Sequence, residues 1–276
     1  MSRQAPLEAL RSDPARGAIL TDVDGTLAPI VERPELAEVP AEARALLERL
    51  GERYGLVGCI SGRQAGEARR LVGVPGIAYA GNHGLELLLP GDERPRSDPS
   101  LRGRERDAAE FVAALGPEKL TAAGLRLEDK GPIQALHWRG AADEGSAEAR
   151  AEEIAAAAER DGIEPRRGRK VLELRPAGGG GKDAAVRSLL SAPLPLASHL
   201  SSRSGKRCEI AIYAGDDRTD LDAFRALREL REAGSLETTI CVAIASAEGP
   251  SELTEEADLT VEGPAGWLAI LESLTR

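Results

Sequence analysis

Two carboxylates, Asp22 and Asp24, stand two residues apart at the end of a short apolar run, residues 17–20, just before the chain turns at Gly25. A buried pair of like charges is costly unless a positive group joins it. Carboxylate oxygens are ligands that Mg²⁺ prefers, and protein-bound Mg²⁺ commonly bridges to phosphate. The pair therefore predicts a site where a metal ion meets a phosphate, if other segments supply the remaining groups.

Three other segments offer groups that complement this pair. Ser61 supplies a hydroxyl, Lys182 a positive charge for phosphate oxygens, and Asp216 a further oxygen ligand. All fall where strands of an α/β domain are expected to end, and open α/β sheets bind ligands at that edge. Each segment alone has a plainer interpretation as a turn, a helix cap or a solvated helix start. Their combination favours one joint site.

The residue types indicate phosphoryl transfer in two steps. Asp22 would attack phosphorus and become an aspartyl phosphate. Asp24 would protonate the leaving sugar oxygen and then take a proton from the hydrolytic water. Mg²⁺ and Lys182 would stabilise charge on the equatorial oxygens. The candidate metal ligands are Asp22, Asp24 and Asp216. Two neighbouring carboxylates are candidates for the outer shell or for ordering the loop, namely Asp217 and Asp220.

The segments that carry these residues alternate between strand and helix. Apolar runs predict strands at residues 18–20, 54–60, 76–80, 209–214, 239–244 and 258–261. Helical spacing predicts helices at residues 41–53, 64–71, 182–190, 220–233 and 266–273. This order predicts an α/β domain built on a parallel sheet.

The middle of the chain has a different pattern. Residues 90–99 and 176–181 are rich in Pro, Gly or both, and predict linkers. Between them we expect two helices, at 104–115 and 147–160, and three strands with alternating polarity, at 125–130, 133–139 and 171–175. The predicted organisation is a core of residues 1–98 and 177–276 with an inserted α+β module of residues 99–176.

Alternation assigns the side chains of the three inserted strands to two faces. The expected apolar face comprises Leu125, Leu127, Leu136, Trp138, Leu172 and Leu174. The expected charged face comprises Arg126, Glu128, Lys130, His137, Arg139, Glu173 and Arg175. A solvated face is the ordinary interpretation for an antiparallel sheet. The alternative is a lid whose polar face closes on a hydroxyl-rich substrate.

Bulk properties exclude several classes of protein. A formal net charge of −10 disfavours a nucleic-acid partner, because phosphate backbones attract basic surfaces. No apolar run is long enough to span a membrane, and the polar N-terminus is unlike a secretory signal. Three widely spaced cysteines, Cys59, Cys208 and Cys241, fit reduced core thiols better than metal ligands or disulfides. We therefore expect a cytoplasmic protein.

The motifs together resemble a known family. Those of the phosphate site are Asp22–Ile30, Ser61–Arg63, Lys182 and Gly215–Phe224. Those outside it are the loop Gly81–Gly84, the charged positions Glu128, Lys130, His137 and Arg139, and the strand Val171–Pro176. The first set is similar to the motifs of the haloacid dehalogenase superfamily of phosphotransferases. The second set makes the resemblance closer to the trehalose-6-phosphate phosphatases.

The resemblance implies a Rossmann-like core with an α+β cap of the C2B type and a Mg²⁺-dependent release of trehalose and phosphate from trehalose 6-phosphate. It also implies that the cap grips the sugar remote from the phosphate through Glu128, Lys130 and Glu173. Three residues are further candidates for binding the phosphate-bearing sugar: Arg63, His83 and Arg139.

Two alternatives remain open. The chain resembles other sugar phosphatases of the superfamily, acting on sucrose 6-phosphate or a mannosyl-phosphoglycerate ester. A non-catalytic partner of trehalose-phosphate synthase is the second alternative, although the three aspartates that such proteins tend to lose, Asp22, Asp24 and Asp216, are present. A synthase would in either case act in trans, since the chain has no region of that size.

Overall fold

The computed structural model of the chain describes residues 5–31, 36–98, 101, 103–168, 170–191, 207–246 and 249–276. The chain divides into two compact units. The core unit comprises Met1–Arg96 and Gly181–Arg276, and the inserted unit comprises Ser97–Gly180. Within the described residues, no helix is long and apolar enough to cross a membrane.

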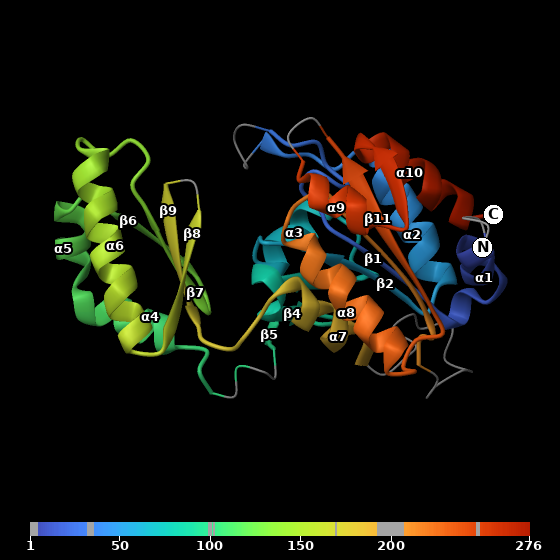
Figure 1. The fold of residues 1–276 in the computed structure, drawn as a ribbon, viewed down its shortest axis with the longest axis horizontal. Helices are drawn as coiled ribbons and strands as arrows, with labels where there is room; N and C mark the ends of the chain where they lie inside the picture. Colours follow the sequence, from blue (N-terminus) through green and yellow to red (C-terminus); the bar gives the residue numbers. More distant parts are fainter. Residues whose placement is uncertain are drawn as a thin grey trace. The chain divides into compact units, whose positions relative to one another are not determined.

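The core unit is built on an eight-stranded sheet with the order β12-β11-β10-β1-β2-β3-β4-β5. Strands β1, β2 and β11 of this sheet are labelled in Figure 1. Neighbouring strands from β12 to β3 are parallel, and β4 runs antiparallel to β3. The strands are β1 (Gly17–Thr21), β2 (Leu56–Ile60), β3 (Ala78–Gly81), β4 (Glu86–Leu88), β5 (Arg96–Ser97), β10 (Ile210–Gly215), β11 (Thr238–Ala245) and β12 (Leu259–Glu262).

Helices cover both faces of this sheet. Their bounds are α1 (Ala5–Ser12), α2 (Ala41–Arg53), α3 (Ala65–Val72), α7 (Lys182–Ser191), α8 (Asp220–Glu232), α9 (Ser251–Glu256) and α10 (Gly263–Leu274), with short 3-10 turns η1 (Pro14–Arg16) and η3 (Asn82–Gly84). Side chains of α1, α2, α3 and α10 pack in one apolar cluster, and those of α7, α8 and α9 pack in a second. Along β1, Ile19 enters the first cluster while Ala18 and Leu20 enter the second, as expected of alternation on a strand buried on both faces. The two clusters hold the sheet rigid from either side.

The carboxyl ends of the central strands lie level with one another. Thr21 at the end of β1 pairs with Cys59 of β2 and Ala214 of β10. The backbone N–H of Asp22 donates to the carbonyl of Ala214 at 2.8 Å, which extends the pairing by one residue. Side chains that follow these strands are therefore carried to the same edge of the sheet.

The inserted unit has a four-stranded antiparallel sheet with the order β6-β7-β9-β8. Its elements are α4 (Asp107–Leu115), α5 (Pro117–Ala122), β6 (Arg126–Lys130), β7 (Ile133–His137), α6 (Glu144–Arg160), β8 (Ile163–Gly168) and β9 (Val171–Pro176). The apolar face of the sheet packs with α4, α5 and α6 in one cluster, which includes Trp138. Leu127 lies in one row with Leu136 and Leu172 on the apolar face, but it is 36% exposed because β6 is an edge strand.

The predicted fold class is confirmed, since a mostly parallel α/β sheet carries a separate α+β insert. Several elements differ from their predictions. Helix α4 begins at Asp107, later than residue 104, and β7 ends at His137, earlier than residue 139. Strand β8 was not predicted, because the sequence IEPRRG carries two arginines, a glutamate and a proline at a sheet edge. The stretch predicted as the first linker contains β5, and its last residue, Pro99, lies outside the described residues.

Candidate functional site

Four residues predicted to form a phosphate site lie at the carboxyl edge of the core sheet. Asp22 follows β1, Ser61 follows β2, Asp216 follows β10, and Lys182 is the first residue of α7. These four side chains are buried. A pocket of about 410 Å³ opens there, lined by Asp22, Asp24, Ile30, Gly62, His83, Lys182, Asp216, Asp217, Thr219, Ser246, Gly249 and Pro250.

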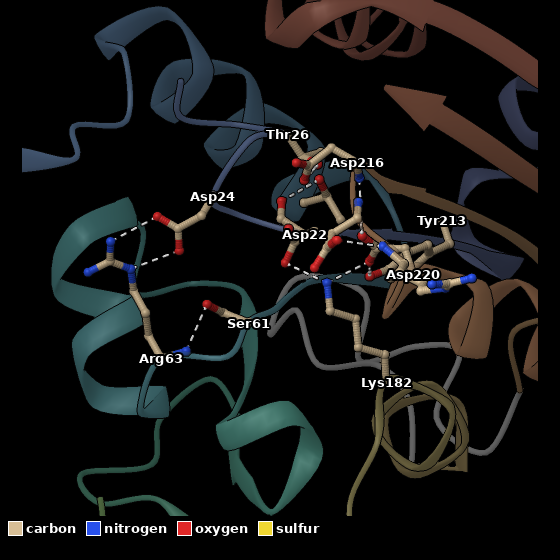
Figure 2. Close-up of polar contacts among 12 residues, drawn as sticks. Asp22, Asp24, Thr26, Ser61, Arg63, Lys182, Tyr213, Asp216 and Asp220 are labelled. Atoms are coloured by element: carbon tan, nitrogen blue, oxygen red, sulfur yellow. Dashed lines mark hydrogen bonds and ion pairs between the residues drawn. The ribbon is translucent and has the colours of Figure 1, made fainter. Parts of the chain in front are cut away.

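Lys182 supplies the positive charge that the aspartates require. Its Nζ lies 3.0 Å from Oδ1 of Asp22 and 2.6 Å from Oδ1 of Asp220 (Figure 2). Burial alone would lower the pKa of Lys182, but the charges of Asp22 and Asp220 outweigh it and raise the pKa above its usual value. The lysine therefore remains an ammonium shared by two buried carboxylates.

Three buried carboxylates have oxygens within 4.8 Å of one another, those of Asp22, Asp216 and Asp220. Burial raises the pKa of Asp22 well above its usual value, and Lys182 opposes the shift only in part. Burial and the charge of Asp220 raise the pKa of Asp216 to about 6, against the hydrogen bond from Thr26. Such a cluster carries more negative charge than one lysine balances, and its hard oxygen donors fit a divalent cation.

Asp220 accepts hydrogen bonds at both of its carboxylate oxygens. The two predicted ligands of this cluster, Asp22 and Asp216, accept from Lys182 and Thr26, each at Oδ1. Oδ1 of Asp220 accepts from Lys182 and from the hydroxyl of Tyr213, and Oδ2 accepts from the backbone N–H groups of Asp216 and Asp217 at 3.1 and 2.9 Å. Asp220 thus ties down the backbone of the loop after β10. The exposed Asp217 takes part through its backbone, and its own carboxylate accepts from the N–H of Arg218.

Asp24 is placed differently from Asp22. Its carboxylate accepts from Nε and Nη2 of Arg63, both at 2.8 Å, and lies apart from the Asp22, Asp216 and Lys182 cluster (Figure 2). A third bond, from Nη1 of Arg63 to Glu67 at 2.8 Å, holds the guanidinium in place. These hydrogen bonds raise the pKa of Arg63 above its usual value, the one to Asp24 most of all. The structure therefore does not bring the Asp24 carboxylate to the other two predicted metal ligands, and it occupies Arg63 with protein partners.

Gly25 allows the loop after β1 to pass close to the carboxylate of Asp216, a candidate metal ligand. Its φ is +86°, and a Cβ at this position would lie 2.0 Å from Oδ2 of Asp216. Only glycine tolerates both conditions. Thr26 follows and donates its hydroxyl to Oδ1 of Asp216 at 3.0 Å. This Asp-Gly-Thr segment thus couples the loops that follow β1 and β10.

The loop that carries His83 is tied to Ser61. The N–H of His83 donates to the carbonyl of Ser61 at 3.0 Å, and its own carbonyl accepts from Gly181 at 2.6 Å. Asn82 and His83 both have positive φ, 50° and 54°, which is uncommon for residues with side chains and costs backbone strain. The strained turn places His83 in the wall of the pocket. The backbone of His83 is bonded to Gly181, the residue that precedes Lys182.

Two buried residues that hydrogen-bond to groups of the site, Trp267 and Tyr213, were not predicted from the sequence. The indole N–H of Trp267 donates to the hydroxyl of Thr21 at 3.1 Å, and that hydroxyl donates to the carbonyl of Asp22. Tyr213 lies within a run of apolar strand residues, so its contact with Asp220 had no signal in the pattern. Such contacts depend on register between distant segments, which periodicity does not report.

The charged face of the inserted unit carries most of the residues predicted for it. Register places Glu128, Ala135 and Glu173 in one row across β6, β7 and β9. Nζ of Lys130 lies 3.2 Å from Oε1 of Glu173, whose other oxygen pairs with Arg175. The buried Ala135 and Ile133 form an apolar floor between these charges.

Arg139 is the remaining predicted sugar-binding position on this unit, and His137 belongs to the predicted charged face. Nε2 of His137 lies 2.7 Å from Oε2 of Glu128. Arg139 is exposed in the turn after β7, where its charge helps to lower the pKa of Glu144. It does not lie on the strand with the other charges, because β7 ends two residues earlier.

Comparison with known proteins agrees with this architecture. The chain is 36% identical over 211 residues to the trehalose-phosphate phosphatase of Mycobacterium avium (strain 104), covering 76% of this chain and 51% of that protein. It is 35% identical over 215 residues to the one from Mycobacterium marinum, covering 77% and 52%. The chain thus spans about half the length of the curated relatives that it matches.

Solved structures extend the comparison to the whole chain. The C-terminal domain of a trehalose-6-phosphate phosphatase from C. albicans superposes with a TM-score of 0.69 at 22% identity, covering 100% of this chain and 97% of that one. A trehalose-6-phosphate phosphatase related protein gives a TM-score of 0.66 at 25% identity, covering 94% and 96%.

A parallel α/β core that gathers aspartates from two strand ends around a lysine, with an α+β insert, defines the haloacid dehalogenase-like class. A structure described as a haloacid dehalogenase-like hydrolase, from Bacteroides thetaiotaomicron, shares the fold with a TM-score of 0.59 at 16% identity, covering 94% of this chain and 99% of that one. Within that class the family model for trehalose-phosphatase matches residues 20–263. The chain belongs to the trehalose-phosphatase family.

Proposed function

We propose that this protein hydrolyses trehalose 6-phosphate to trehalose and phosphate, as the names of its curated relatives indicate for those proteins. The observation that carries the proposal is Lys182, held between Asp22 and Asp220 in the wall of a pocket. An ammonium has three N–H donors, and these two carboxylates take two of them. The third is available for a phosphate oxygen, next to the carboxylate best placed to attack phosphorus.

In the first step, an oxygen of Asp22 forms a bond to phosphorus while the bond from phosphorus to the sugar oxygen breaks. Lys182 and the hydroxyl of Ser61 balance charge on the phosphoryl oxygens. Asp24 gives a proton to the departing sugar oxygen, so that trehalose leaves as a neutral alcohol. To do so, the Asp24 carboxylate leaves the guanidinium of Arg63, whose N–H donors occupy both of its oxygens.

In the second step, water attacks phosphorus and the bond to the Asp22 oxygen breaks. Asp24 takes the proton of the water and returns to its starting state with the release of phosphate. Arg63 is proposed as the residue that receives the Asp24 carboxylate between these steps. Its role is then to position Asp24, and contact with the sugar is left to His83, which lines the pocket.

Mg²⁺ is the cofactor that the donor set fits. We propose that Asp22 and Asp216 hold it through their carboxylates, since their pKa values are raised by burial and by neighbouring charge that a cation would balance. When bound, the ion supplies positive charge to the phosphate oxygens. Thr26 and Gly25 keep the Asp216 carboxylate close to the loop of Asp22. Asp24, a predicted ligand, is assigned to proton transfer.

The inserted unit is proposed to read the sugar that carries no phosphate. Lys130 and Glu173, with Glu128 in the adjoining row, present donors and acceptors over an apolar floor. Sugar hydroxyls both donate and accept hydrogen bonds. A surface that offers lysine donors beside glutamate acceptors can therefore pair with them. Arg139 is a candidate at the margin of this surface.

A panel of substrates assayed with and without Mg²⁺ tests the proposal. The expected result is phosphate release that requires Mg²⁺ and is fastest with trehalose 6-phosphate. Faster release from sucrose 6-phosphate or a mannosyl-phosphoglycerate would reassign the substrate within the same chemistry. Absence of release from every substrate would favour a non-catalytic role. The C-terminal domain of a Candida albicans trehalose synthase regulatory protein shares the fold, with a TM-score of 0.65 at 15% identity over 98% of both chains.

A further inference from the structure

Tyr213 is bonded to the proposed catalytic cluster but is not among the residues that line the pocket. It is the fourth residue of β10 and is fully buried. Its hydroxyl donates to Oδ1 of Asp220, the oxygen that also accepts from Nζ of Lys182 (Figure 2). One carboxylate oxygen is therefore shared between a neutral donor and the ammonium that serves the phosphate.

Lys182 donates to two carboxylates, those of Asp22 and Asp220. Its contact with Asp220, at 2.6 Å, is shorter than its contact with Asp22, at 3.0 Å. Asp220 is completely buried, so its charge is satisfied only by protein donors. Each hydrogen bond that Asp220 accepts from another donor reduces the attraction between its carboxylate and Lys182.

From this arrangement we infer that Tyr213 is a positioning residue for the proposed phosphatase reaction: its hydroxyl bonds Asp220 and so keeps Lys182 within reach of Asp22 and of the phosphate. Without the hydroxyl, the Asp220 oxygen loses a donor and draws the ammonium toward itself and away from Asp22. Because the phosphoryl group is transferred beside Lys182, a displacement of this kind weakens stabilisation in the transition state.

The chain provides its own controls, because all three of its tyrosines are buried and each donates a hydrogen bond. Tyr54 donates to the carbonyl of Leu274 at 3.0 Å, and Tyr79 to the carbonyl of Val74 at 2.6 Å. Only Tyr213 donates to a carboxylate of the site. Replacing each tyrosine by Phe removes one buried hydroxyl and keeps the ring. The variants of Tyr54 and Tyr79 therefore show the effect of losing a buried hydrogen bond alone, and the variant of Tyr213 also loses the contact with Asp220.

The ring of Tyr213 is held independently of its hydroxyl. It packs edge-to-face with Phe224 of α8, with ring centroids 6.1 Å apart. A phenylalanine fills the same space and preserves this contact. We therefore expect Tyr213→Phe to fold and to melt close to Tyr79→Phe.

The test is the steady-state kinetics of Tyr213→Phe and Tyr79→Phe with trehalose 6-phosphate and with a small aryl phosphate. This inference rests on the proposed phosphatase function, and the wild-type enzyme shows separately whether that function holds. We expect Tyr213→Phe to lower kcat by at least about ten-fold on both substrates with KM within about two-fold of wild type, and Tyr79→Phe to keep both constants within about two-fold. Equal kcat for Tyr213→Phe and wild type, or a loss that parallels unfolding in a thermal melt, would overturn the positioning role.

A double-variant cycle locates the effect. If Tyr213 acts through Asp220, the double variant Tyr213→Phe/Asp220→Asn has a kcat no lower than that of Asp220→Asn alone, because the two substitutions remove the same interaction. Losses that multiply would show that Tyr213 acts by another route and would contradict the inference.

Discussion

The buried cluster of the core unit and the charged face of the inserted unit both consist of paired charges, but they differ in how those charges are satisfied. In the core, the Asp220 carboxylate is fully buried and accepts four hydrogen bonds from named donors. On the inserted sheet, Lys130 and Glu173 keep 20% and 17% of their side-chain surface exposed. Removing one member of a buried pair leaves an uncompensated charge, costing ~3–5 kcal/mol, whereas partly exposed pairs contribute far less.

This difference separates two kinds of information. A saturated buried network admits few substitutions, because every group has fixed partners, and so it suits chemistry that is common to many substrates. Partly exposed charges can exchange their protein partners for ligand hydroxyls at low cost, and so they suit recognition. The comparison predicts that variants of the core unit change the rate with any phosphate ester, and that variants of the inserted unit change the choice of ester.

The largest effect is expected from Asp22→Asn. An amide cannot form the aspartyl phosphate, so phosphate release should fall by about 10⁴-fold or more on every substrate. Continuous phosphate assays under saturating Mg²⁺ measure it. Asp222→Asn on α8 is the matched control and should retain activity. Asp222 lies 3.2 Å from Arg225, and neither residue lines the pocket. Substantial turnover by Asp22→Asn would show that another group attacks phosphorus.

Removal of divalent metal should make stability depend on pH. Burial raises the pKa of Asp216 from 3.8 to about 6, so the folded state binds more protons than the unfolded chain between those values. Stability is then present at low pH and lost as pH rises from about 4 to 7, by ~3 kcal/mol from this residue, and Asp22 adds in the same direction. Because Mg²⁺ needs ionised ligands, it should raise the melting temperature more at pH 7 than at pH 5.

Thermal melts at both pH values, with EDTA or with Mg²⁺, measure this linkage. Asp216→Asn is the control, because it removes one titrating group and should reduce both the pH dependence and the response to Mg²⁺. A metal-free wild type that gains stability from pH 5 to pH 7 would contradict the assignment.

Lys130→Met is expected to raise KM for trehalose 6-phosphate by about ten-fold or more while leaving turnover of a small aryl phosphate within about two-fold. The reason is that Lys130 contributes to the sugar-facing surface and not to the phosphate site. Lys170→Met serves as the control, since Lys170 pairs with Glu144 elsewhere on the same unit. An equal loss on both substrates would place Lys130 in a structural role.

The smallest effect is expected from Arg63→Lys. A lysine keeps the charge but cannot form the two parallel hydrogen bonds to Asp24, so kcat should fall by about three- to ten-fold with KM for trehalose 6-phosphate nearly unchanged. Steady-state kinetics separate the two constants, with Arg69→Lys on α3 as the control. A rise in KM alone would return Arg63 to the sugar-binding role that the sequence suggested.

Sequence reasoning reached the fold class and the carboxyl edge of the sheet because both rest on local signals. Asp22, Ser61, Lys182 and Asp216 each follow an apolar strand or open a helix, and parallel strands bring such ends together. Helix α2 occupies the predicted residues 41–53, where apolar spacing is regular. Strand β8 escaped notice because its polar residues lie at the edge of the sheet.

The orientation of side chains within the site was beyond the reach of the sequence. Asp22 and Asp24 look alike in the motif, yet one turns toward Lys182 and the other toward Arg63. Their directions depend on the packing of loops from three strands, as does the contact between Tyr213 and Asp220. Spacing along one segment carries no information about such contacts.

The most direct test of the division between the two units is the ratio of kcat/KM for trehalose 6-phosphate to kcat/KM for a small aryl phosphate, measured in wild type, Ser61→Ala and Glu173→Ala. Ser61→Ala should lower both constants by the same factor and leave the ratio within about two-fold, and Glu173→Ala should lower the ratio by at least about ten-fold. A ratio unchanged by Glu173→Ala, or one that falls equally in Ser61→Ala, would contradict the assignment of chemistry to the core and of substrate choice to the insert.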